Sequence, residues 1–410
     1  MMVPDGPGAA AYLNAMAQNL LRFGAQSHQP TGGFGYLDQF GCPDQAMGRP
    51  LWITCRMTHC FALASMLGYP GAAALTDHGL AALAGPFADP VNGGWYAALD
   101  ATAAPALTTK EAYGHAFVVL AAASAVLAGR PGARGLLDQA LAVMEQHFWE
   151  SGRRAMADLA NQDFSWLEPY RGANANMHTV EAFLAAAVAT GERQWSQRAL
   201  AMCQLVIDQH ARSNTWRIPE HFRPDWSVDL DYNQATPAHQ FRPYGATPGH
   251  GLEWARLLLQ LASHLGAAAP SWIEQAARAL YDRAVADGWE AGPMPGFVYT
   301  TDWAGSVVIR ERLHWVMAEA TAAAAVLHQA TGEPTYLADY QRWWQVIDSH
   351  FVDQANGSWH HELSPQGQPG ATLWPGKPDI YHALQACLIP QLPVSPAVAA
   401  GVAVSGLTLV

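Results

Sequence analysis

The sequence has few charged residues, and positive charge is the scarcer sign. Only 14% of its 410 residues are charged, against about 25% in an average soluble protein. Its 22 lysines and arginines face 34 aspartates and glutamates, for a formal net charge of −12. This charge repels nucleic-acid phosphates and anionic membrane surfaces, and no basic run offsets it. We therefore expect neither nucleic acid nor a membrane as a partner.

Paired cysteines and long apolar runs are also missing. The five cysteines are odd in number and form no CxxC pair, which excludes a disulfide framework and a zinc ribbon. The first residues show no basic segment followed by an apolar one, and no run of about 18 uncharged apolar residues occurs later. The sequence thus predicts a cytoplasmic protein.

Common motifs for nucleotide, metal and acyl-enzyme chemistry are absent as well. We find no GxSxG, no phosphate-binding GxxxxGK[ST], no GxGxxG after a strand and no HExxH. The acidic residues Asp225, Asp229 and Asp231 lack the glycine and terminal glutamate of an EF-hand. We expect no cofactor and no catalytic metal, so proton chemistry among His, Arg, Glu, Asn and Tyr remains.

Apolar and aromatic side chains, in contrast, are abundant. The chain is 50% hydrophobic and contains 16 tryptophans, enough to bury a large core. Apolar residues recur with helical periodicity in twelve segments. These are 8–25, 52–68, 73–86, 110–129, 133–149, 174–190, 194–211, 248–265, 270–287, 309–331, 334–350 and 379–389. The apolar stretch 394–410 is expected to pack as a tail.

The connections between these segments repeat. An aromatic residue or histidine precedes a short turn and a second aromatic residue, about every 60 to 75 residues. Examples are GPFADPVNGGWY, QHFWESGRR, DQHARSNTW, DGWEAGPMPGFVY and SHFVDQANGSWHHEL. The repeat predicts a helical hairpin used many times, in an open solenoid or a closed toroid. Six hairpins would form an all-α (α/α)6 barrel with short β-hairpins in its loops, and residues 1–410 would form one catalytic domain.

Six helix starts carry polar side chains where apolar ones would be expected. If alternate helices form an inner ring, these starts meet at one mouth of the barrel, and concave mouths are where ligands usually bind. The six are WITCRMTH (52–59), KEAYGHAF (110–117), NANMHTVEA (174–182), TPGHGLEW (247–254), RLHWVMAEA (312–320) and KPDIYHALQ (377–385).

Two of these starts hold a histidine followed three residues later by a glutamate. His178 and Glu181 form one pair, and His250 and Glu253 form the other. This spacing places both side chains on one helix face. The carboxylate then orients the imidazole for acid–base work, or the histidine is simply a hydrogen-bonded structural residue. The order is the reverse of the Glu-x-x-His of di-iron bundles, which argues against a metal.

Arg56 lies in an otherwise apolar helix. A buried guanidinium must be paired with an anion or with several acceptors. Arg56 therefore either stabilises an enediolate or binds an anionic substituent of a ligand, or it forms a structural ion pair. Trp52 and Trp315 are two of the tryptophans that either stack on a sugar or fill the core.

Taken together, the motifs point to a known family. RMTH at 56–59, the N-x-x-x-H-x-x-E that ends at Glu181, PGHGLEW at 248–254, RLHWVMAEA at 312–320 and Tyr381-His382 occur in that family's order. In these motifs the chain resembles the N-acylglucosamine 2-epimerase superfamily over nearly its whole length. Within it, the chain is most similar to the aldose–ketose isomerase branch, which contains mannose and sulfoquinovose isomerases.

The resemblance implies an (α/α)6 barrel and cofactor-free isomerisation through a cis-enediol. It implies that His250 and His382 are the acid–base pair and that Arg56 stabilises the enediolate. His382 is expected to move the proton between C1 and C2 while His250 assists ring opening, with the reverse assignment as the alternative. It implies that Glu253 and Glu319 orient or polarise the catalytic imidazoles. The residues that it implies to line the sugar are Tyr113, Asn174, His178 and Trp315, with Arg242 at the far end of the sugar.

Several outcomes stay open at this point. Interconversion of D-mannose and D-fructose is the first expectation, with D-lyxose and D-xylulose as further substrates of the same type. Sulfoquinovose is the alternative, since Arg56 or Arg242 can pair with a sulfonate, and return of the proton to C2 would give a 2-epimerase. From other classes, a glycoside hydrolase would use Glu253 and Glu319 as its two carboxylates, and a helical scaffold would use none of these residues. The expected partner is a monosaccharide, and the enzyme is a monomer or a homo-oligomer.

Overall fold

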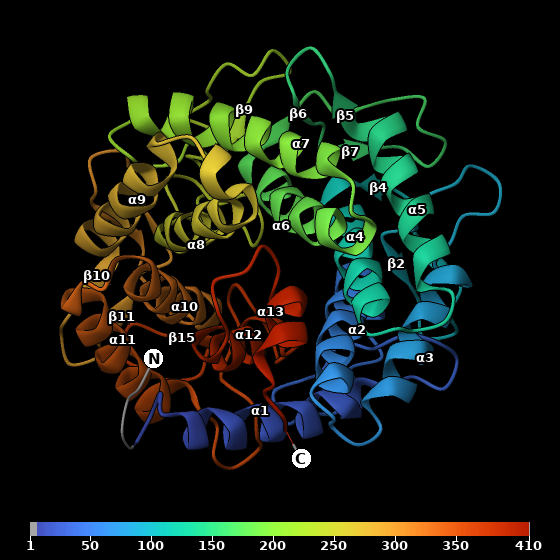
Figure 1. Cartoon of the computed structure of the whole chain (residues 1–410), viewed down its shortest axis with the longest axis horizontal. Helices are drawn as coiled ribbons and strands as arrows, with labels where there is room; N and C mark the ends of the chain where they lie inside the picture. The colour runs from blue at the N-terminus through green and yellow to red at the C-terminus, as the bar shows by residue number, and fades with distance from the viewer. Residues whose placement is uncertain (1–5, 410) are drawn as a thin grey trace. The chain divides into compact units, whose positions relative to one another are not determined.

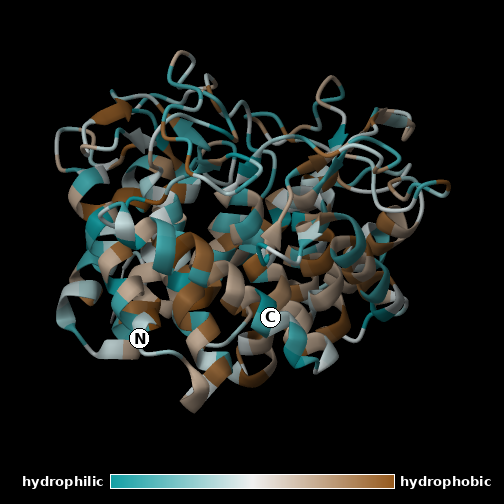
Figure 2. Cartoon of the chain, turned by 90° about the horizontal axis from the view of Figure 1, so that it is seen from above, coloured by the Kyte–Doolittle hydropathy of each residue, from teal (hydrophilic) through white to brown (hydrophobic). Residues whose placement is uncertain are grey.

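The computed structural model describes residues 6–409, and its secondary structure is mostly helical. Hydrophobic residues run along the helices, and hydrophilic residues are frequent in the loops (Figure 2). Unit 1, a compact unit, comprises residues 6–20, 203–377 and 382–396; unit 2 comprises residues 21–202, 378–381 and 397–409. The expectation of one catalytic domain over residues 1–410 stays a prediction.

A row of three helices forms the centre of unit 2. Helix α4 (Ala112–Leu127) packs against α2 (Leu51–Met66) on one side and α6 (Ala173–Thr190) on the other (Figure 1). Helix α3 (Ala72–Ala84) packs on α2, and α5 (Ala133–Val143) packs on α4. Helices that alternate in the sequence therefore share the central row, as a repeated hairpin predicts.

Burial of the central row explains its composition. Every residue of α4 from Gly114 to Ala125 is buried, which is typical of a helix that is apolar nearly all round. The apolar tail forms α13 (Val398–Ser405), which packs against α2, α4 and α6. The expected packing of the tail is thus confirmed.

Unit 1 repeats this alternation. Helix α8 (Pro248–Leu265) packs against α10 (His314–Thr331), with α9 (Trp272–Gly288) on α8 and α11 (Pro334–Val346) on α10. Helix α12 (Tyr381–Leu388) reaches α10 through the contact of His382 with Glu319. The remaining helices are α1 (Ala10–Gly24), α7 (Arg193–Cys203), the π-helices Met144–Phe148, Gln204–Ala211 and Ile347–Phe351, and the 3-10 helices Ala25–Ser27, Gly266–Ala268 and Ile389–Gln391.

The strands are short and pair antiparallel, which confirms the β-hairpins expected in the loops. Unit 2 contains β1 (Arg49–Pro50), β2 (Ala98–Leu99) and β3 (Pro105–Leu107) in one sheet, β4 (Lys110–Glu111) with β7 (Leu159–Ala160), and β5 (Trp149–Glu150) with β6 (Ala155–Met156). Unit 1 contains β10 (Trp289–Glu290) with β11 (Gly296–Phe297), β12 (Thr300–Thr301) with β13 (Val307–Ile309), and β14 (Arg312–Leu313) with β15 (Glu362–Leu363). The bounds of β8 and β9 are Arg171–Gly172 and His221–Phe222. Strands β1, β4, β8 and β14 run directly into α2, α4, α6 and α10, so the sheets fix where these helices start.

In residues 6–409, no helix combines the length and the hydropathy needed to cross a bilayer.

A buried basic residue precedes the start of five helices. It lies two residues before α2, α4, α6 and α10, and four residues before α12. The five are Arg49, Lys110, Arg171, Arg312 and Lys377. Each donates to a loop carbonyl or carboxylate, as the contacts of Arg49 with the Gly32 oxygen and of Arg171 with Glu150 illustrate. These cations therefore tie the helix starts to the neighbouring loops.

The two lysines of this set use the same local motif. Nζ of Lys110 lies 2.9 Å from Oδ2 of Asp89, and Nζ of Lys377 lies 2.6 Å from Oδ2 of Asp353. Although burial raises the pKa of each aspartate, hydrogen bonds from the lysine and from the asparagine three residues on lower it below its ordinary range. Both aspartates therefore stay ionised, and each buried cation is neutralised.

We expect Lys377→Met to lower the free energy of unfolding by about 3–5 kcal/mol, because it leaves the buried carboxylate of Asp353 without its cation. The midpoint of urea unfolding measures the loss. Arg134→Met is the control, since its ion pair with Asp138 is 53% exposed on both sides and should contribute less than about 1 kcal/mol. Equal losses in the two variants would contradict the structural role of Lys377.

Candidate active site

The residues expected to act in catalysis lie partly in unit 1 and partly in unit 2. Unit 1 contains His250, Trp315 and His382, together with the glutamates of α8 and α10. The indole ring of Trp315 has its centroid 5.2 Å from that of His250 and 5.9 Å from that of His382. The tryptophan thus lies beside both imidazoles, and the two candidate acid–base residues share one environment.

His250 occupies the first turn of α8 and meets a carboxylate that the sequence did not indicate. Its Nδ1 lies 3.0 and 2.9 Å from the two oxygens of Glu220, and both residues are buried. An ionised carboxylate only accepts hydrogen bonds, so Nδ1 carries a proton, and in the neutral imidazole Nε2 is the nitrogen with the lone pair. The expectation that Glu253 orients His250 is wrong, because Glu253 accepts a hydrogen bond from Arg256 instead.

His382 is held in the same way. Its Nδ1 lies 2.9 Å from Oε1 of Glu319, and the second oxygen of that carboxylate accepts from Nε of Arg256. The contact agrees with the expectation that Glu319 lies next to the His382 imidazole. Each of the two histidines therefore has a buried carboxylate at Nδ1.

We expect Glu220→Gln to lower kcat about 10- to 100-fold, the range typical of residues that orient an imidazole. A glutamine amide can donate to Nδ1, which favours the tautomer with the proton on Nε2 and removes the base. Steady-state kinetics measure the change, with Glu145→Gln, an exposed substitution on the other unit, as the control. An unchanged kcat would show that Glu220 does not fix the tautomer.

Three donor groups of unit 1 lie close enough to be weighed as a metal site. Ligand atoms of Glu253, Glu319 and His382 are all within 4.8 Å of one another. The guanidinium of Arg256 is already hydrogen-bonded to both carboxylates, at 3.4 Å from Oε1 of Glu253 and 2.9 Å from Oε2 of Glu319. Because a fixed cation neutralises these carboxylates, the donor set does not fit a divalent ion well.

Arg56 is the centre of the group in unit 2. Its Nη1 lies 3.1 Å from Oδ2 of Asp379, and its Nη2 donates to the Tyr113 hydroxyl at 3.0 Å. Burial lowers the pKa of this guanidinium, but Tyr113 and Asp379 together raise it above its ordinary value. The carbon Cζ also lies over the rings of Trp52 and Tyr381, at 4.9 and 4.8 Å. The ion-pair alternative for Arg56 is thus present in the structure, and Trp52 packs on this cation.

One nitrogen of Arg56 is not used by these contacts. Nε has no hydrogen-bond partner in the described residues, and neither does Oδ1 of Asn174 on α6. Buried polar atoms are normally satisfied, so both atoms are suited to bind a polar ligand. Arg56 therefore combines a structural ion pair with capacity for a further acceptor.

His178 lies on α6 beside Tyr113, whose ring centroid is 5.2 Å away. Its Nδ1 is 3.5 Å from Oε2 of Glu181, a long contact, and the same oxygen accepts a hydrogen bond from the Tyr381 hydroxyl. The expected His178–Glu181 pair is present but loose. Glu181 is divided between the imidazole and Tyr381, which distinguishes His178 from the two histidines of unit 1.

Arg242 belongs to unit 1, and its backbone amide donates to Nδ1 of His239 at 3.0 Å. It is partly exposed in the loop before α8, where its Nη1 lies 3.5 Å from the Tyr232 hydroxyl and its carbonyl accepts from Asn233. Its role at the far end of a sugar stays a prediction.

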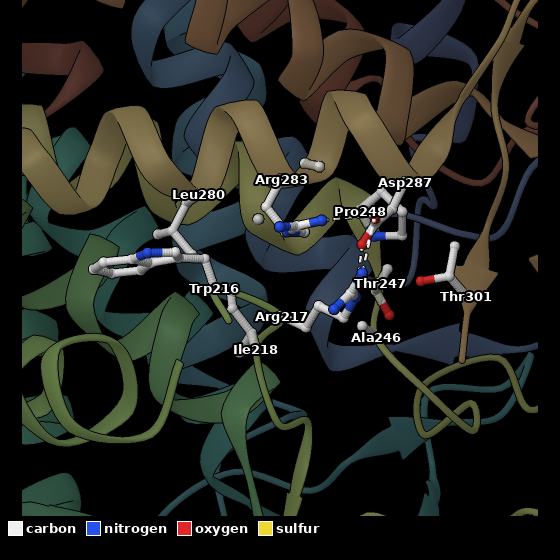
Figure 3. Close-up of a pocket in the computed structure, with 12 residues that line it drawn as sticks. Trp216, Arg217, Ile218, Ala246, Thr247, Pro248, Leu280, Arg283, Asp287 and Thr301 are labelled. Atoms are coloured by element: carbon white, nitrogen blue, oxygen red, sulfur yellow. Dashed lines mark hydrogen bonds and ion pairs between the residues drawn. The ribbon is translucent and has the colours of Figure 1, made fainter. Parts of the chain in front are cut away.

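A small cavity of unit 1 lies on the α9 side of the start of α8 and contains none of the expected site residues (Figure 3). Arg217 spans it to Asp287, with Nε 2.7 Å from Oδ2, and Arg283 of α9 joins the same carboxylate. The hydroxyls of Thr247 and Thr301 line it. These residues lie between α9 and the start of α8.

Two other histidines near the helix starts have structural roles. Burial lowers the pKa of His59 to about 4 and of His115 to about 3. His59 contacts the Ser124 hydroxyl, and His115 accepts from the Trp95 amide while its Nδ1 donates to a carbonyl. Both stay neutral near pH 7, so neither is suited to exchange protons with a substrate.

Sequence reasoning missed Glu220, Arg256 and Asp379 as partners of the candidate residues. Arg256 follows Glu253 by three residues, so the same spacing rule that paired His250 with Glu253 would have found it. Glu220 lies in the irregular stretch 212–247, where no helical or strand periodicity predicts which way a side chain points. Asp379 belongs to the motif KPDIYHALQ, but nothing in the sequence links it to Arg56.

Comparison with known proteins decides the family. The model of the family described as N-acylglucosamine 2-epimerase (GlcNAc 2-epimerase) matches residues 32–386. The chain belongs to this family. Among its members, the D-mannose isomerase of Thermobifida fusca is 52% identical over 400 residues, which cover 97% of each chain. The resemblance inferred from the motifs is thereby confirmed.

Two solved structures have folds similar to that of this chain. The crystal structure of a D-mannose isomerase has a TM-score of 0.87 and 29% identity, covering 93% of this chain and 98% of that one. Cellobiose 2-epimerase from Spirochaeta thermophila has a TM-score of 0.80 at 22% identity, covering 93% and 95%. This likeness confirms the expected fold class, an (α/α)6 barrel. Because isomerases and epimerases share the fold, it does not decide between them.

Proposed function

We propose that this family member is an aldose–ketose isomerase that interconverts D-mannose and D-fructose. Identity of 52% to a named D-mannose isomerase over 97% of the chain supports the substrate. The observation that carries the chemistry is the arrangement in unit 1, where two imidazoles flank Trp315 and each has a buried carboxylate at Nδ1. Two such groups supply a base and an acid near neutral pH.

The proposed steps move protons only. One imidazole assists opening of the sugar ring, and the other removes the proton from C2 of the open aldose. The electrons of the C–H bond form a cis-enediolate, and the same imidazolium returns the proton to C1. The O2 proton is lost as O1 gains one, so a ketose with the same atoms results. We assign the C1/C2 transfer to His382 and ring opening to His250, with Arg56 stabilising the enediolate charge.

The remaining residues are proposed to hold the sugar. Trp315 offers an apolar ring face beside both imidazoles, and Tyr113, Asn174 and His178 offer polar groups from α4 and α6. Neither a cofactor nor a metal is needed for these steps. The neutralisation of Glu253 and Glu319 by Arg256 supports this, and it also disfavours the hydrolase alternative, since carboxylates held by a guanidinium are poor general acids.

The composition of the chain also bears on the charge of its substrate and on its location, and the site bears on its oligomeric state. The net charge of −12 supports a neutral monosaccharide as substrate and disfavours nucleic acid or an anionic membrane surface. The odd number of cysteines supports a cytoplasmic location. The His250–Trp315–His382 group is complete within one chain, so the proposal applies to a monomer and to a homo-oligomer alike.

Product analysis tests this function directly. Purified protein with excess EDTA is incubated separately with D-mannose, D-lyxose, D-glucose and sulfoquinovose, and the products are separated by chromatography. Fructose from mannose under chelation is the expected result. Glucose that appears from mannose before fructose would show that the enzyme is a 2-epimerase and not an isomerase. Turnover of sulfoquinovose alone would show that the substrate is a sulfosugar. No turnover of any sugar would overturn the proposal.

A further inference from the structure

One face of α8 carries a stripe of polar residues that extends beyond the catalytic histidine. His250, Glu253, Arg256 and Gln260 follow one another at intervals of three, three and four residues, which is the spacing of one helix face. All four are buried, and Arg256 has no exposed surface. A buried arginine in the middle of such a stripe must be explained by its partners.

Arg256 joins the carboxylates of two helices. Nε donates to Oε2 of Glu319 on α10 at 2.9 Å, Nη2 lies 3.4 Å from Oε1 of Glu253, and Nη1 donates to Oε1 of Gln260 at 2.8 Å. Oε1 of Glu319 faces Nδ1 of His382 at 2.9 Å. Arg256 and His382 therefore bind opposite oxygens of the same carboxylate.

We propose that Arg256 is a positioning residue that acts through Glu319 to fix the tautomer and the protonation of His382. The inference rests on the proposed function of His382 as the residue that moves the proton. With one oxygen held by the guanidinium, the carboxylate presents its other oxygen to Nδ1 in a single orientation. The imidazole is thereby kept with its proton on Nδ1 and its lone pair on Nε2.

The charge of Arg256 acts on the same group. The charged and titratable side chains of unit 1 that face His382 include Glu319 and His314 on α10 and Glu253 with Arg256 on α8. Without the guanidinium, two ionised carboxylates would lie beside the imidazole with no cation between them. The group would then bind a proton at higher pH.

A proton that binds the imidazole occupies Nε2, because Nδ1 already carries one, and it removes the base. Loss of Arg256 should therefore move the acid limb of activity to higher pH.

The variants Arg256→Met, Arg256→Lys and Glu253→Gln/Arg256→Met test the proposal. Arg256→Met should lower kcat about 10- to 100-fold with little change in KM, and should move the acid limb of the kcat/KM profile up by about one pH unit. Arg256→Lys keeps the charge and should keep the limb in place, with a smaller loss of kcat. The double variant restores the local charge and should return the limb to its wild-type position while kcat stays low. If Arg256→Met does not fold, this balanced double variant and Arg256→Lys carry the test.

Arg217→Met is the matched control. Arg217 also belongs to a largely buried arginine–carboxylate pair of unit 1, with its side chain 11% exposed, but the printed partners of Asp287 are Arg217 and Arg283 and include neither His250 nor His382. This variant should lose stability and leave the pH profile unchanged. If Arg256→Met behaves in the same way, its role is structural and the proposal is overturned.

A second readout needs no substrate, which separates this inference from the proposed function. In protein labelled with 15N-histidine, NMR reports the tautomer and the titration of His382, assigned with a His382→Gln variant. The wild type should show the proton on Nδ1, and the midpoint should rise in Arg256→Met. Unchanged tautomer and midpoint would refute the inference even in an active enzyme. A shift in a protein that turns over no sugar would refute only the proposed function.

Discussion

His382→Gln is expected to lower kcat for mannose about 100- to 10,000-fold, the contribution typical of a general acid–base residue. Glutamine preserves much of the side-chain volume and can still meet Oε1 of Glu319, the partner of Nδ1 in the wild type. It cannot take up a proton at neutral pH, so the transfer from C2 to C1 loses its carrier. KM should stay within a few-fold, since the substitution removes chemistry more than binding.

Kinetics in D2O give a second readout for His382. The wild type should place solvent deuterium in the ketose to an extent set by exchange of the carried proton, and His382→Gln should incorporate almost none. His115→Gln is the control, because this buried histidine stays neutral and makes only structural contacts. Comparable kcat losses in the two variants, measured per folded molecule, would contradict the role of His382.

Arg56→Lys is expected to lower kcat about 100- to 1,000-fold, as the loss of a group that stabilises a developing charge does. Lysine can keep an ion pair with Asp379, but its three N–H groups lie on a single nitrogen and cannot reproduce the planar guanidinium fork that reaches Asp379, Tyr113 and an enediolate oxygen together. The substitution therefore separates the two interpretations of Arg56. A structural ion pair predicts lower stability with kcat nearly unchanged, whereas the proposed role predicts a large loss of kcat with stability largely kept.

Arg49→Lys is the matched control for this experiment. Arg49 is also buried in unit 2, and it donates to the carbonyl oxygens of Gly32 and Ala101 and to the Thr31 hydroxyl. Its replacement should cost stability, measured by thermal unfolding, and leave kcat within a few-fold. If Arg56→Lys has only that effect, Arg56 is structural and the enediolate has another partner.

Helix positions were largely predictable because helical periodicity is a local property. The predicted segment 52–68 is α2 (Leu51–Met66), and 248–265 is α8 (Pro248–Leu265). The segment 194–211 is helical throughout, but its second half is the π-helix Gln204–Ala211, which periodicity does not distinguish from an α-helix. The start predicted at 379 is two residues early, since the side chain of Asp379 accepts from the Tyr381 amide and so lies ahead of the first turn of α12.

The sequence predicted which residues belong to the candidate site, but it did not predict how they pair. Histidines, tryptophan and arginine at helix starts were found because such residues are rare on apolar helices. Their partners were not, as the two histidine–glutamate pairs show. The i,i+3 rule correctly places Glu181 near His178, at 3.5 Å, yet it fails for His250, whose partner Glu220 lies 30 residues away.

By itself, the sequence determined the helical fold class, the family and the identity of the chemical groups, because hydrophobic period, turn residues and motif spacing act over short distances along the chain. Only the tertiary structure decided which carboxylate meets which cation. Asp379 meets Arg56 across 323 residues, and Glu319 meets His382 across 63. Such pairings depend on which helices pack together, and the electrostatic energy of a buried pair depends on distances of a few ångströms that no sequence spacing encodes.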